Sequence, residues 1–81
     1  MDDRTLRQTV FETLRHIAPE VVPEELDPRA RLRDQVDLDS MDWLTFLLRL
    51  HERLGVDIPE ADYGKLASLD DLLAYLRAKA S

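Results

Sequence analysis

Residues 37–44 read Asp37-Leu38-Asp39-Ser40-Met41-Asp42-Trp43-Leu44. Acidic and hydroxyl residues here run into a strongly apolar segment, which is typical of a loop that leads into a helix. The first backbone N–H groups of a helix have no partner within it, and with the helix dipole they favour a nearby anion. Ser40 is therefore a candidate to carry a phosphate ester at the protein surface.

Ser40 also has a purely structural interpretation. Serine and aspartate are both common N-cap residues, so either Ser40 or Asp39 is a candidate cap of the helix that follows. If Asp39 is the cap, Ser40 occupies the first helical position. The local sequence alone favours capping, so a functional role for Ser40 depends on the pattern of the whole chain.

The apolar segment predicts a helix from about Ser40 to Leu54, ended by Gly55 in a left-handed conformation. One wide stripe of this helix is predicted to be buried, and it consists of Trp43, Phe46, Leu47, Leu50 and Leu54. A second apolar stripe, here called the docking stripe, consists of Met41, Leu44 and Leu48. Two apolar stripes indicate either a central helix or a helix with an edge that docks partners. A small domain is expected to leave some of this surface exposed, and exposed apolar patches tend to be contact sites.

The segments before this helix predict one more long helix and a long loop. Apolar residues at helical spacing predict an amphipathic helix from Asp3 to about Ile17, which Pro19 stops. Residues 19–39 then form a connection whose apolar residues are expected to hold it to the core: Val21, Val22, Leu26, Leu32 and Val36. The alternating Arg29, Arg31 and Arg33 are interpreted as a solvated loop edge. A short strand there would find no partner nearby in the sequence.

After Gly55, residues 56–59 are expected to be extended. The next segment, from Glu60 to about Leu66, is predicted to form a short helix whose inward-facing residues are Ala61, Tyr63 and Leu66. Ser68-Leu69-Asp70-Asp71 has the pattern of a capping box. It predicts a last helix that runs to about Lys79. The sequence thus predicts an all-α fold, with three main helices, a short third helix and a long first loop, in one domain over residues 1–81.

Composition excludes several classes of function. The 81 residues include 11 basic and 17 acidic ones, for a net charge of −6, which disfavours binding to nucleic acid or to an anionic membrane surface. There is no cysteine, so no disulfide or thiolate site is expected. No stretch reaches the ~18 apolar residues that span a bilayer. A charged N-terminus without an apolar run predicts no signal peptide and a cytoplasmic location.

The sequence also shows no recognisable set of catalytic residues. His16 and His51 lie on separate predicted helices, and no motif links either one to a nucleophile. The aspartates around Ser40 are not spaced as a calcium loop, so no metal site is expected. The sequence therefore predicts a protein that is not itself a catalyst.

The whole pattern resembles the acyl carrier protein family. The resemblance rests first on Asp39-Ser40-Met41-Asp42 and on the end of the apolar helix, Leu54-Gly55-Val56-Asp57-Ile58-Pro59. Leu32-Arg33-Asp34 upstream and Leu66-Ala67-Ser68-Leu69-Asp70-Asp71-Leu72 downstream are also similar to the family's sequence. The similarity covers the full chain, including its length, its acidity and the order of its predicted helices.

This resemblance implies a right-handed four-helix bundle in which Ser40 carries phosphopantetheine. A phosphopantetheinyl transferase would transfer that group from coenzyme A, and Asp39 would assist the transferase and its metal. The docking stripe would contact partner enzymes that activate or transfer acyl groups. The cargo would travel as a thioester on the arm, the chain is expected to be a monomer, and catalysis would belong to the partners.

Three departures from the family pattern stand out. Asp37 replaces the family's usual glycine, and Trp43 is large enough to narrow any interior acyl pocket. The negative face of the apolar helix is diluted by Thr45, Arg49, His51 and Arg53. These features favour a specialised stand-alone carrier in lipid or secondary-metabolite biosynthesis, with a fatty acyl, polyketide or aminoacyl cargo. The alternative is an unmodified helical interaction domain that docks through the same stripe.

Overall fold

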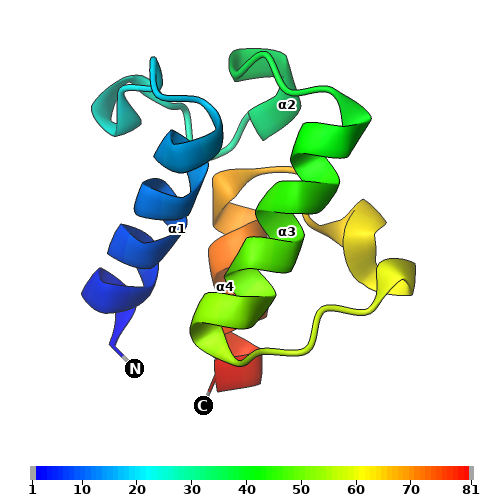
Figure 1. The fold of residues 1–81 in the computed structure, drawn as a ribbon. Helices are drawn as coiled ribbons and strands as arrows, with labels where there is room; N and C mark the ends of the chain where they lie inside the picture. Colours follow the sequence, from blue (N-terminus) through cyan, green and yellow to red (C-terminus); the bar gives the residue numbers. More distant parts are fainter. Residues whose placement is uncertain (1, 81) are drawn as a thin grey trace.

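A computed structural model describes residues 2–80, and they form an all-α bundle (Figure 1). In chain order its helices are α1 (Asp3–Ile17), η1 (Pro23–Glu25), α2 (Leu32–Gln35), α3 (Ser40–Leu54), η2 (Glu60–Lys65) and α4 (Leu69–Ala80), of which η1 and η2 are 3₁₀ helices. The predicted all-α class is confirmed. So are the bounds of the two long helices predicted for Asp3–Ile17 and Ser40–Leu54.

The core forms where α1 packs against both α3 and α4 (Figure 1). Each of these helices contributes an apolar stripe at helical spacing, as expected for amphipathic helices around one core. The fully enclosed side chains include Leu6, Val10 and Leu14 of α1, Phe46, Leu47 and Leu50 of α3, and Leu69, Leu72 and Leu76 of α4. The stripe of α3 that was predicted to be buried is buried, with only its last residue, Leu54, partly exposed.

The connection between α1 and α3 is more regular than predicted. It contains η1 and α2, and the side chain of Gln35 ties it together. Gln35 Oε1 accepts a hydrogen bond from Asp27 N at 2.6 Å, and its Nε2 donates to Asp27 O at 2.9 Å and to Ala30 O at 3.2 Å. Val22, expected to pin the loop, is instead 45% exposed. That expectation was wrong because the extended residue before η1 points its side chain outward.

The segment at Arg31 has a pairing partner, and it does not lie nearby in the sequence. Arg31 and Ser68 form an isolated antiparallel bridge, and Leu32 N donates a hydrogen bond to Ala67 O at 2.9 Å. The partner comes from the segment just before α4, which is remote in sequence. Tertiary packing therefore supplies a pairing that neighbouring residues did not suggest.

The start of α4 is capped as predicted. Asp71 N donates to Ser68 Oγ at 3.1 Å, and Ser68 N donates to Asp71 Oδ2 at 3.4 Å, which is the reciprocal pattern of a capping box. The short helix before it is η2. Tyr63 is partly buried and Leu66 fully buried, but Ala61 is exposed, so its predicted inward position was wrong. A 3₁₀ helix has three residues per turn, so Tyr63 and Leu66, three residues apart, lie on the same side. Ala61 is out of step with them and lies on a different side.

A hydrogen bond between side chains attaches η2 to α4. Tyr75 Oη donates to Asp62 Oδ2 at 2.6 Å, and Lys65 Nζ lies 3.5 Å from Asp62 Oδ1. The bond from Tyr75 lowers the pKa of Asp62 below its ordinary value of 3.8. The same bond, assisted by desolvation, raises the pKa of Tyr75 to about 12. The bond therefore favours the neutral phenol and the charged carboxylate.

This pair gives a defined dependence of stability on pH. A raised folded-state pKa of Tyr75 stabilises the fold fully below pH 10.0, and that contribution is lost as the pH rises toward about 12. The lowered pKa of Asp62 contributes above pH 3.8 and is lost on acidification through the folded-state pKa. We expect Tyr75→Phe to lower the melting temperature at pH 7 and to flatten its decline above pH 10.0.

Thermal melts followed by circular dichroism across this alkaline range test the expectation. Tyr63→Phe is the matched control, because the Tyr63 hydroxyl forms no hydrogen bond within residues 2–80. A Tyr75→Phe profile parallel to that of the wild type would show that the bond does not couple folding to the proton of Tyr75.

Candidate functional site

The N-terminus of α3 is capped by Asp39. Asp39 Oδ1 accepts a hydrogen bond from Asp42 N at 2.8 Å, and Asp39 O accepts one from Trp43 N at 3.0 Å. Asp39 has the extended backbone of an N-cap, with φ −80° and ψ 179°. The sequence allowed either residue as the N-cap. In the structure Asp39 is the N-cap, and Ser40 is the first residue of the helix.

Ser40 is exposed on a firmly held turn. Its hydroxyl forms no hydrogen bond to any residue of the described range 2–80. On either side of it, Leu38 is 6% exposed and Trp43 is 8% exposed, so both anchor the turn to the core. The ring of Trp43 lies 5.4 Å from that of Phe46, measured between centroids. The arrangement presents a free hydroxyl to solvent from a rigid helix start.

The residues around Ser40 fit a phosphate ester in part. The helix start offers unpaired N–H groups and the positive end of the dipole. Asp37, Asp39 and Asp42 add negative charge nearby, and they suit a partner with a basic surface. Among residues 2–80, no group of three His, Cys, Asp or Glu side chains is placed to hold a metal ion.

The docking stripe is exposed along α3, directly after Ser40. Met41 is 71% exposed, Leu44 43% and Leu48 55%. These three residues recur at helical spacing, so they form one apolar edge beside the serine. Of the two possibilities that the sequence left open, a central helix and a helix with an exposed apolar edge, the structure shows the second.

His51 has a structural position that the sequence did not reveal. Its Nδ1 lies 2.7 Å from Val56 O, a distance at which the protonated nitrogen donates to the carbonyl. Gly55, with φ 65°, takes the predicted left-handed conformation, and its N–H donates to His51 O at 2.9 Å. His51 thus lies at the end of α3 opposite to Ser40, where it bonds to the segment that follows the helix.

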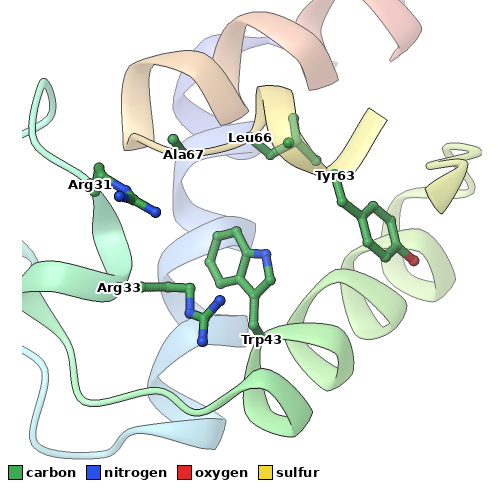
Figure 2. A pocket seen from close by; sticks show the side chains of 7 residues that line it. Arg31, Arg33, Trp43, Tyr63, Leu66 and Ala67 are labelled. Atoms are coloured by element: carbon green, nitrogen blue, oxygen red, sulfur yellow. The ribbon is translucent and has the colours of Figure 1, made fainter. Parts of the chain in front are cut away.

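A cavity of about 270 Å³ lies between α2, the first turn of α3 and the segment after η2 (Figure 2). Its lining consists of Arg31, Arg33, Trp43, Tyr63, Gly64, Leu66 and Ala67. Trp43, expected to narrow an interior pocket, forms one wall. Sequence reasoning did not find this cavity, because three separate segments come together to build it.

Comparison with known proteins agrees with the fold. The family model described as "Phosphopantetheine attachment site" matches residues 4–76. The acyl carrier protein of Thermosynechococcus vestitus is 31% identical over 61 residues, which cover 75% of each chain. The acyl carrier protein of Campylobacter hominis is 29% identical over 70 residues, covering 83% of this chain and 89% of the relative.

Two further similarities extend the comparison. The meromycolate extension acyl carrier protein of Mycolicibacterium aurum is 28% identical over 74 residues, covering 88% of this chain and 76% of the relative. In fold, the chain matches a solved structure of acyl carrier protein from Enterococcus faecalis with a TM-score of 0.77, at 17% identity and over 98% of this chain and 99% of that one. The chain therefore belongs to the acyl carrier protein family, whose members carry acyl groups on phosphopantetheine.

Proposed function

We propose that Ser40 Oγ is the atom of this chain to which phosphopantetheine is attached. The sequence contains three serines, at positions 40, 68 and 81. Ser68 is 6% exposed and its Oγ accepts the capping hydrogen bond from Asp71, whereas Ser81 lies outside the described residues. The free, exposed hydroxyl of Ser40 at the start of α3 is the observation that carries the proposal.

In the proposed modification, Ser40 Oγ bonds to the phosphorus of the phosphopantetheine half of coenzyme A. The pyrophosphate P–O bond breaks, the nucleotide leaves, and the proton of the hydroxyl passes to the transferase. The attached group supplies a thiol, which this cysteine-free chain lacks, and acyl cargo is held on it as a thioester. The chain then acts as a carrier without catalysis of its own, and the tether raises the cargo's concentration at partner enzymes.

Asp39 is proposed to serve both the helix and the transferase. Its Oδ1 is engaged by Asp42 N, while Oδ2 forms no hydrogen bond within the described residues. The carboxylate is exposed beside Ser40, so it suits recognition by the transferase and its metal. The proposed partners are this transferase and enzymes that activate or transfer acyl groups. A net charge of −6 opposes self-association, which supports a monomer.

An intact mass measurement tests the proposed function. The wild-type chain is incubated with coenzyme A, magnesium and a promiscuous phosphopantetheinyl transferase, and a mass increase by one arm is expected. The competing function, an unmodified interaction domain that docks through Met41, Leu44 and Leu48, requires an unchanged mass. An unchanged mass with a transferase that modifies a known carrier in the same tube would reject the carrier function.

The docking stripe is proposed to contact these partners, and Leu44→Glu tests it. We expect kcat/KM for arm transfer to fall by roughly tenfold or more, because central apolar contacts of an interface are each worth above ~1 kcal/mol. The melting temperature should change little, since Leu44 is 43% exposed. Thr45→Glu is the matched control, because it adds the same charge at a neighbouring exposed residue outside the stripe. Equal losses in both variants would attribute the effect to charge and contradict an apolar contact at Leu44.

A further inference from the structure

The cavity beside Trp43 combines apolar lining residues with two cationic side chains. Trp43 and Leu66 line it and are almost wholly buried, at 8% and 0% exposed. Arg31 and Arg33 are exposed and line the cavity, and Figure 2 shows their side chains extending from the α2 segment toward Trp43. Such a lining suits a ligand with an apolar body and a negatively charged end.

Neither arginine has an acidic partner in the described part of the chain. The salt bridges found in residues 2–80 join Arg53 to Glu12, Lys65 to Asp62 and Arg77 to Asp3. A chain with a net charge of −6 thus leaves two neighbouring guanidinium groups unpaired at one cavity. Guanidinium binds carboxylate through two parallel hydrogen bonds, so this is a favourable site for a carboxylate.

The backbone at these two arginines is held by contacts with neighbouring segments. Arg31 is bridged to Ser68, and Arg33 lies within α2. Gln35 Nε2 donates to Ala30 O at 3.2 Å, which fixes the turn before Arg31. The interpretation as a solvated loop edge still suits Arg29, which is exposed and does not line the cavity. Arg31 and Arg33 instead line the cavity from a backbone that is held by these contacts.

We propose that this cavity receives a short acyl cargo that ends in a carboxylate, with the carboxylate bound by Arg31 and Arg33. The proposal rests on the proposed attachment of the arm at Ser40. Residues three apart on a helix are neighbours, so Ser40 lies next to Trp43, and a flexible arm can fold back to reach the cavity. A volume of about 270 Å³ is just below the usual range for ligand pockets (~300–1,000 Å³), which favours a short acyl group.

The fluorescence of Trp43 provides the test, because it is the only tryptophan in the sequence. The arm is first added and verified by intact mass. The holo-protein is then loaded with a succinyl group or with a butyryl group, which has the same number of carbons and no carboxylate. We expect the succinyl form alone to show a shifted Trp43 emission maximum and reduced quenching by acrylamide.

Charge variants assign that shift to the two arginines. Arg31→Gln/Arg33→Gln should abolish the difference between the two cargoes, whereas Arg29→Gln should retain it. Both arginines are exposed, so the double variant should remain folded, and its circular dichroism spectrum checks this. The single variants Arg31→Gln and Arg33→Gln provide the same readout if the double variant fails to fold.

Three results would overturn the proposal. Equal shifts for the succinyl and butyryl forms would mean that the carboxylate is not recognised. A full shift in the unloaded holo-protein would mean that the arginines bind the phosphate of the arm instead of the cargo. An unchanged difference between the cargoes in the arginine variants would exclude Arg31 and Arg33. If no arm is added in the first step, the attachment at Ser40 fails, and the cavity proposal fails with it.

Discussion

Ser40→Ala is expected to keep its unmodified mass under conditions in which the wild-type chain gains one phosphopantetheine arm. The reason is the position of its hydroxyl, which is exposed and free at the first residue of α3, while the hydroxyl of Ser68 is buried in a capping box. Alanine keeps the helix and removes the oxygen that would form the ester. Loss of modification should therefore be complete, not partial.

The stability of Ser40→Ala should stay close to that of the wild type. Asp39 supplies the capping bond to Asp42 N, so the variant keeps the cap, and alanine is a good helix former. We expect a change in unfolding free energy of about 0–1 kcal/mol, measured by urea denaturation. A larger loss would mean that the Ser40 hydroxyl is structural, and a modified Ser40→Ala chain would place the arm on another residue.

Phe46→Ala should cause the largest loss of stability among substitutions in α3. Phe46 is 0% exposed and contacts Trp43, so its removal deletes buried apolar surface and leaves a void. Comparable substitutions cost about 3–5 kcal/mol. Small domains have total stabilities of about 5–15 kcal/mol, so a large part of the stability of the fold would be lost.

Urea denaturation of Phe46→Ala is best compared with that of Leu48→Ala. Leu48 lies on the same helix but is 55% exposed, so its truncation should change the unfolding free energy by only ~0.5 kcal/mol. Similar losses in the two variants would contradict the division of α3 into a buried and an exposed stripe. The two substitutions together therefore test which face of α3 packs against α1.

Features set by local interactions were predictable from the sequence. The apolar spacing of α1 and α3 and the stop signals Pro19 and Gly55 sufficed for their bounds, and the Ser68–Asp71 pattern sufficed for the start of α4. Each of these signals acts within about four residues of the backbone groups it affects. The two apolar stripes of α3 were predictable for the same reason, and the structure shows that the docking stripe is the exposed one.

Features set by distant residues were not predictable in this way. The bridge between Arg31 and Ser68 joins segments far apart in the chain, and the clamp by Gln35 depends on how the loop folds back. Ala61 was misplaced because apolar character does not distinguish the faces of a short 3₁₀ helix. At the site itself, Asp39 and Ser40 are both good caps, so only the structure distinguished them.

The most direct test of the central claim is to locate the arm on the modified wild-type chain. Proteolysis of the holo-protein followed by tandem mass spectrometry assigns the added mass to one residue. The structure predicts that the arm is found on Ser40 alone, on the exposed first residue of α3. An arm found on Ser68, on Ser81 or on a threonine would contradict it, as would a chain that a competent transferase leaves unmodified.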